Sequence, residues 1–146
     1  MIAYLDSSVL ARAYLADEPG HEEASELLEN SEIGLVTGSW TRIEVAGALV
    51  RACRTGRGDE AGLLALLAGD LGPEGPVTVV TVDQALVEDD AFRFVRQHGI
   101  RAMAAWHLAV ALHSLPSLAE RGEEACFASR DKAQAAVAVI LGFSLL

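Results

Sequence analysis

The sequence predicts an α/β protein in which helices cover both faces of a parallel sheet. Short apolar segments of strand length alternate with helical segments along the whole chain, an order typical of right-handed strand–helix–strand units. Gly and Pro fall mostly between these segments, and no repeat or long linker separates them. One domain spanning residues 1–146 is therefore expected. In such a sheet, the functional site is expected at the carboxyl ends of the strands.

Five segments are expected to form the strands, because they are short, largely apolar and bounded by turn or capping residues. They are residues 2–6, 32–38, 77–82, 124–129 and 143–146.

Apolar spacing and capping residues predict the helices between these strands. Ser7 and Ser8 are plausible N-caps of the first helix. Ser39 can cap the helix from Trp40 to Thr55, and Asp83 the helix that carries residues 92–99. The other helical segments are 20–30, 59–71, 100–115 and 130–142. Residues 100–115 are apolar on nearly every side, which is typical of a central packed helix.

Composition restricts the function. The net charge is −10, from 21 acidic and 11 basic residues, so the overall field repels a polyanion and any contact with RNA must be local. Arg51, Arg54 and Arg101 are candidates for such contacts, although solvated helix ends, where cations suit the helix dipole, are the simpler explanation for each of them. No apolar run is long enough to span a membrane, and the first residues lack a secretory leader pattern. A cytoplasmic protein without membrane association is expected.

Three carboxylates in apolar surroundings are the candidate site. Asp6 and Asp131 each follow a predicted strand, although either one can be an ordinary helix N-cap. Glu44 lies inside a helix, and Gly47 one turn away leaves room for a ligand or another backbone. The alternative for Glu44 is a solvated position with a weak contact to Arg51. Three buried carboxylates that converge are typical ligands of Mg²⁺ or Mn²⁺. Without metal, at least one of them should have a raised pKa.

Four segments in this order resemble the PIN domain, in its VapC-type toxin ribonuclease branch. They are LDSSVL (5–10), TRIEVAGAL (41–49), RAMAAWHLAVAL (101–112) and CFASRDKAQAAVAVILGFSLL (126–146). The resemblance covers essentially the whole chain. It implies a three-layer α/β/α sandwich around a parallel sheet, and hydrolysis of RNA phosphodiester bonds with one or two Mg²⁺ or Mn²⁺ ions.

The resemblance also implies roles for individual residues and partners. Asp6, Glu44 and Asp131 take metal-ligand or water-orienting roles, and Ser8 and Ser129 match hydroxyl positions that support the acidic cluster. Capping of the following helices explains both serines equally well. The family further implies a type II toxin–antitoxin system, a small VapB-like antitoxin whose basic side chain enters the acidic site, and homodimers.

Position 104 departs from the family pattern. Members usually carry an aspartate where this chain has Ala104, so one metal ligand is missing and activity should be impaired. Either the natural protein has lost activity and only binds, or an aspartate was deliberately replaced to silence a toxic enzyme. We favour replacement, because the other acidic residues are intact. His107, one turn away, is expected to be structural.

Two other classes of protein remain possible. A phosphatase of the HAD type also has an aspartate after its first strand, but it expects a second acid two residues later, where this chain has Ser8. A non-catalytic module that binds a basic partner or RNA fits the same residues. The GxxxxGK[ST] motif of P-loop proteins is absent.

Overall fold

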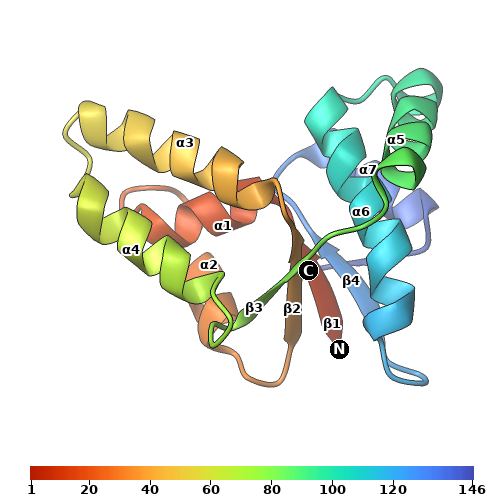
Figure 1. Ribbon diagram of the computed structural model, residues 1–146, viewed down its shortest axis with the longest axis horizontal. Coiled ribbons are helices and arrows are strands. Elements are labelled where there is room, and N and C mark those ends of the chain that lie inside the picture. The colour runs from red at the N-terminus through yellow and green to blue at the C-terminus, as the bar shows by residue number, and fades with distance from the viewer.

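The computed structural model describes residues 1–146 and contains one five-stranded sheet (Figure 1). The strands are β1 (Ile2–Leu5), β2 (Gly34–Gly38), β3 (Val77–Val80), β4 (Ala125–Ala128) and β5 (Ser144–Leu145). Their order across the sheet is β3-β2-β1-β4-β5, and every neighbouring pair is parallel. The central strand is β1, so the residue that follows it lies at the middle of the sheet edge.

Seven helices connect the strands. They are α1 (Ser7–Tyr14), α2 (His21–Glu29), α3 (Thr41–Arg54), α4 (Glu60–Asp70), α5 (Gln84–His98), α6 (Ala102–Leu118) and α7 (Lys132–Ile140). Helices α1 to α4 lie on one side of the sheet and α5 to α7 on the other (Figure 1). The three-layer α/β/α architecture is confirmed.

The core is divided between the two faces of the sheet. In β1, Ala3 and Leu5 pack in a cluster with residues of α1 to α4, whereas Ile2 and Tyr4 pack in a second cluster with residues of α5 to α7. This division follows from the twofold alternation of side chains along a strand. Because β1 is buried on both faces, its sequence is continuously apolar, as expected of a parallel strand.

Three residues predicted as helix N-caps, Ser7, Ser8 and Ser39, do not have that role. The N-cap of α1 is Asp6, whose carboxylate accepts a hydrogen bond from the backbone N–H of Ser8. Ser39 does not cap α3, because the helix begins one residue later than predicted and its N-cap, Trp40, makes no side-chain hydrogen bond. The predicted cap Asp83 is confirmed. Asp59, predicted as the first residue of a helix, is the N-cap of α4. None of the helices combines the length and apolarity needed to cross a bilayer.

Candidate active site

The carboxyl ends of β1 and β4 place two of the candidate acids at the same edge of the sheet. Leu5 pairs with Ala128 in the parallel register, so Asp6 and Asp131 follow neighbouring strand ends. Asp6 is buried, with 6% of its surface exposed. Its Oδ2 accepts hydrogen bonds from the backbone N–H of Ser8 at 3.1 Å and from the Ser8 hydroxyl at 2.6 Å. Ser8 therefore holds the carboxylate of Asp6 in one orientation.

A buried pair of threonines positions α3 and, with it, Glu44. The hydroxyl of Thr37, at the end of β2, donates to the carbonyl of Leu5 at 2.7 Å. The Thr37 and Thr41 hydroxyls lie 2.7 Å apart, and since Thr37 already donates to Leu5, Thr41 is the donor between them. These bonds join the ends of β1 and β2 to the first turn of α3. Glu44, in that first turn, is therefore held above the sheet edge.

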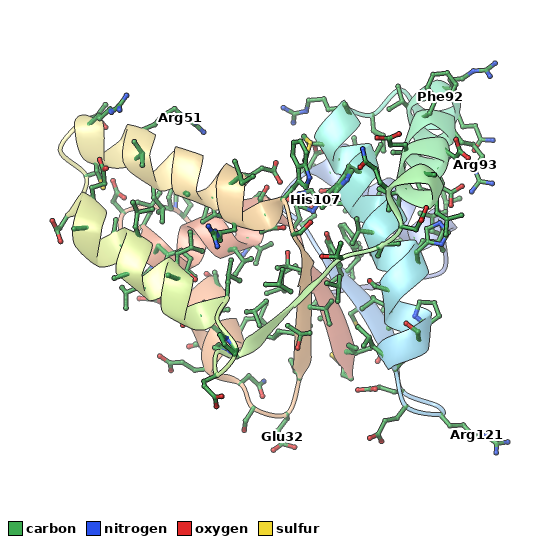
Figure 2. The ribbon with its side chains drawn as sticks, in the orientation of Figure 1. Glu32, Arg51, Phe92, Arg93, His107 and Arg121 are labelled. Atoms are coloured by element: carbon green, nitrogen blue, oxygen red, sulfur yellow. The ribbon has the colours of Figure 1, made fainter.

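His107 of α6 brings the carboxylates of Asp6 and Glu44 together. Its Nε2 lies 2.6 Å from Oε2 of Glu44 and 3.4 Å from Oδ1 of Asp6. His107 is 1% exposed, and Figure 2 shows it at the end of the sheet, between α3 and α6. Two acids that are 38 residues apart in the chain by the printed numbering thus meet at one imidazole nitrogen. Glu44 makes no ion pair with Arg51, so that alternative is wrong.

Tyr4 contacts the ring of His107 from its buried side. The Tyr4 hydroxyl accepts a hydrogen bond from the N–H of Gly38 at 3.1 Å and lies 2.9 Å from Nδ1 of His107. Burial, and then the negative charges of Asp6 and Glu44, raise the pKa of Tyr4 well above its usual value. The hydroxyl therefore keeps its proton, and either it or Nδ1 can be the donor between them. With Nδ1 held by Tyr4, Nε2 of His107 faces the carboxylate of Glu44.

Gly38 is required by close packing at this point. A Cβ at Gly38 would lie 2.6 Å from Cη2 of Trp106 and 2.8 Å from the hydroxyl oxygen of Tyr4. Both neighbours are held in the buried layer beside His107, whose ring meets Trp106 edge to face at 5.1 Å between centroids. The glycine thus allows the backbone of β2 to approach the two rings that support the site.

Asp131 lies beside this pair of acids without joining it. Its Oδ1 accepts from the backbone N–H groups of Ala133 and Gln134, which makes it the N-cap of α7, and its Oδ2 lies 3.1 Å from Arg101. Burial alone would raise the pKa of Asp131, but the hydrogen bonds from the Gln134 backbone, Arg101 and the Ala133 backbone together lower it. The rise in pKa expected for the metal-free cluster is therefore not found at Asp131.

Gln134 connects Asp131 to Asp6. Its side chain is 1% exposed, and its Nε2 donates to the carbonyl of Ala104 at 3.1 Å and, more weakly, to Oδ1 of Asp6 at 3.4 Å. Its Oε1 accepts from the Ser129 hydroxyl at 2.5 Å, and the same hydroxyl accepts from the N–H of Asp131 at 3.0 Å. Ser129 thus supports the cluster through Gln134.

Residues 3–140 match the family model of the PIN domain. The chain belongs to the PIN domain family. PIN domains are in general metal-dependent nucleases, which makes this chain a nuclease-like module. A search of curated proteins found no significant match. The matched region includes all three candidate acids.

The acid pair of this PIN domain fits a divalent cation only in part. The cation Mg²⁺ typically takes one or two carboxylates from a protein and keeps several waters, and Asp6 and Glu44 supply that number. No group of three or more His, Cys, Asp or Glu side chains is arranged to hold a metal. Ala104 is buried and adds no side-chain oxygen. The donor set is thus sufficient for a weak site with two carboxylates.

The remaining predicted residues lie outside the acid pair. Arg101 contacts Asp131, whereas Arg51 and Arg54 are exposed on α3 and form no ion pair. Figure 2 shows Arg51 well away from His107. The Cβ of a residue at Gly47 would meet only the Arg51 guanidinium, at 3.2 Å. No other backbone approaches Gly47, so its smallness serves only to keep the surface beside Glu44 open.

Besides the threonine pair, Tyr4 and Gln134 are residues of the site that were not predicted. Tyr4 is the one hydroxyl-bearing side chain in an otherwise apolar strand, and Gln134 is the one buried polar side chain in α7. Buried polar groups need hydrogen-bond partners. A polar residue at a core position was therefore the available signal for both.

Proposed function

We propose that this PIN domain is the toxin of a type II toxin–antitoxin system, a ribonuclease that hydrolyses RNA phosphodiester bonds with Mg²⁺ or Mn²⁺ and is impaired by Ala104. The observation that supports it best is the meeting of Asp6 and Glu44 at the carboxyl ends of the strands, in a chain of a nuclease family.

In this proposal Asp6 and Glu44 hold the cation. When bound, Mg²⁺ or Mn²⁺ supplies Lewis-acid activation of water and neutralises charge on the phosphate oxygens. Ser8 fixes the orientation of the Asp6 carboxylate. His107, through its Nε2, holds Glu44 in place and lowers the repulsion between the two acids. Asp131, which is partly exposed next to the pair, has the water-orienting role.

Ala104 is the expected cause of low activity. Its backbone carbonyl is bonded to the same Gln134 amide that reaches Asp6. A carboxylate at position 104 would thus project near Asp6 and supply a third ligand. Whether the alanine is natural or was introduced, restoring the acid is the most direct test.

The test compares this chain with Ala104→Asp and with the double variant Ala104→Asp, Glu44→Gln. Each is incubated with a structured RNA in Mg²⁺, in Mn²⁺ and in EDTA, and the products are resolved on a gel. We expect cleavage by Ala104→Asp to exceed that by the parent chain by about 10-fold or more, as for loss of a metal-site interaction. The double variant and the EDTA samples should be inactive.

Cleavage that persists in EDTA, or that is unaffected by Glu44→Gln, would remove the metal-dependent mechanism. If no variant cleaves RNA, the second candidate function applies.

That second candidate is a non-catalytic module that binds a basic antitoxin or RNA. Two observations favour it. No group of three metal-binding side chains is present, and the Glu44 carboxylate already contacts Nε2 of His107. A cavity of about 360 Å³ between α1 and α3 has Ser8, Glu44, Gly47 and Arg51 in its lining. In our proposal this space receives the basic side chain of a VapB-like antitoxin, in a cytoplasmic homodimer.

An arginine-containing peptide tests that part of the proposal. Calorimetry should detect binding to the parent chain and a loss of affinity of about 30-fold or more in Glu44→Gln, because truncating one partner of a charge pair in an interface costs at least about 2 kcal/mol. Arg54→Gln, on an exposed part of α3 outside this cavity, is the control. An equal loss of affinity in Glu44→Gln and Arg54→Gln would contradict specific binding of the peptide's arginine side chain in this cavity.

A further inference from the structure

A second cavity lies beside the acid pair and is built differently. It has a volume of about 290 Å³ and is enclosed by the start of α3, the segment from β3 into α5, and one face of α6. Its walls are mostly apolar, and two tryptophans, Trp40 and Trp106, form one side. Their ring centroids are 6.2 Å apart at an angle of 49°, so the two rings are not stacked on one another.

We infer that this cavity binds one unpaired nucleobase of the RNA strand whose backbone passes the acid pair. The inference rests on the proposed ribonuclease function and adds to it the place where a base is held.

The position of the cavity supports this occupant. Trp106 is adjacent in sequence to His107 and packs against its ring, and the carbonyl of Trp40 accepts from the N–H of Glu44 at 3.1 Å. Both tryptophans are thus attached to the residues of the acid pair. A strand whose phosphate lies at Asp6 and Glu44 has its neighbouring base within reach of this cavity.

The chemistry of the lining also selects a base. RNA-binding proteins stack unpaired bases on aromatic side chains and bond their edges to polar groups. Here Trp40 is 54% exposed, although it is a large apolar side chain, and so presents ring surface to a ligand. Ser39, Thr81, Gln84 and Glu88 add polar groups to the lining.

Charge excludes the phosphate of a nucleotide from this cavity. No lining residue is basic, and the one charged side chain is Glu88, which accepts a hydrogen bond from Gln84 at 2.5 Å. A phosphate would be repelled by this carboxylate, whereas the donor groups on a base edge would be attracted. The base therefore enters and the phosphate remains outside.

The chain provides its own reporter for a test. It contains two tryptophans, and both line this cavity. We titrate the protein with an unlabelled single-stranded RNA oligomer in EDTA, so that no cleavage occurs, and follow tryptophan fluorescence. Saturable quenching is expected. In parallel, anisotropy of a labelled oligomer gives the dissociation constant for each variant.

Trp40→Ala should weaken RNA binding by about 5- to 150-fold, the range for loss of one base stacked on an aromatic side chain. Trp40→Phe should retain most of the affinity. The matched control is Phe92→Ala, because Phe92 is 65% exposed on α5, outside this cavity, where Figure 2 shows it. Circular dichroism confirms that each variant is folded.

The outcomes separate this inference from the function on which it rests. RNA binding without quenching, and with equal affinity in Trp40→Ala, would overturn the base-binding cavity while the ribonuclease proposal stands. No RNA binding by any variant would also overturn the base-binding cavity, whereas the ribonuclease proposal is tested separately by the Mg²⁺-dependent cleavage of RNA by Ala104→Asp. Quenching by an apolar peptide but not by RNA would assign the cavity to a protein partner and overturn the inference.

Discussion

Single residues determine how closely the elements around the acid pair can pack. Gly38 and Gln134 have no charge and take no part in the proposed chemistry, yet the first sets the distance between β2 and α6, and the second joins α7 to Asp6. Each can be tested through stability alone, independently of any activity.

We predict that Gly38→Ala lowers the free energy of unfolding by about 1–3 kcal/mol, the usual cost of overpacking a core. The added methyl group would press on Trp106 and on the hydroxyl of Tyr4. Urea unfolding measures the change. The control is Gly69→Ala, since no atom lies within 4 Å of a Cβ there, and alanine should slightly stabilise α4. Equal stability of Gly38→Ala and the parent chain would show that β2 can move away from the rings.

We also predict that Gln134→Leu lowers the free energy of unfolding by about 1–3 kcal/mol, although leucine is similar in size. The substitution leaves the Ala104 carbonyl and the Ser129 hydroxyl without their buried partner. The matched control, Gln97→Leu, changes an exposed glutamine of α5 and should be nearly neutral in the same urea titration. If Gln134→Leu leaves the free energy of unfolding unchanged, water replaces the lost hydrogen bonds.

At the scale of elements, the sequence predicts the order and type of every helix and strand, because the apolar periodicity is strong and most breaks carry Gly, Pro or a capping residue. The start of α3 is the exception. Serine is favoured at helix N-caps, which is why the sequence predicts Ser39 as one. However, buried hydrogen bonds between Thr37, Thr41 and the end of β1 fix where that helix begins. Such contacts join segments that are distant in sequence, so local pattern does not reveal them.

The same reason limits prediction of the site. Asp6 and Asp131 could be placed at the strand ends from sequence, because parallel strands align their carboxyl ends. The partner of Glu44 could not be found in this way. His107 reaches it only because α3 and α6, on opposite faces of the sheet, both approach the end of β1, which is a property of the helix packing angles.

The N-terminus of α7 gives a prediction about pH. The folded protein lowers the pKa of Asp131, so the ionised carboxylate stabilises the fold above the ordinary aspartate pKa of about 4. This stabilisation is lost as pH falls through the lowered folded pKa. In urea titrations from pH 7 down to pH 3, the difference in free energy of unfolding between the parent chain and Asp131→Asn should therefore shrink.

Asparagine caps helices nearly as well as aspartate, so this variant removes the charge and keeps the cap. A difference that stays constant with pH would contradict the role of the charge. Arg101→Gln should change stability by no more than about 1 kcal/mol, because Arg101 is 86% exposed and such ion pairs are weak.

At the scale of the whole molecule, the net charge of −10 predicts that RNA binding depends little on salt. Arg51, Arg54 and Arg101 are the candidates for phosphate contacts. Three contacts give a slope of about −2 for the logarithm of the binding constant against that of salt concentration, at about −0.7 per phosphate of single-stranded RNA. Anisotropy titrations in EDTA at several potassium concentrations measure this slope.

Arg51→Ala should make the slope shallower by about 0.7 if Arg51 contacts phosphate. A slope much steeper than about −2 would require a basic surface that these residues do not form.

The acid pair belongs to one helical layer and His107 to the other, and this arrangement has a consequence for biosynthesis. Asp6 and Glu44 emerge from the ribosome early, whereas His107, Gln134 and α6, on the other side of the sheet, follow only in the last third of the chain. A nascent polypeptide that has folded its first layer still lacks the imidazole that gathers the acids. The contacts between His107 and the two acids therefore form only when translation is nearly complete.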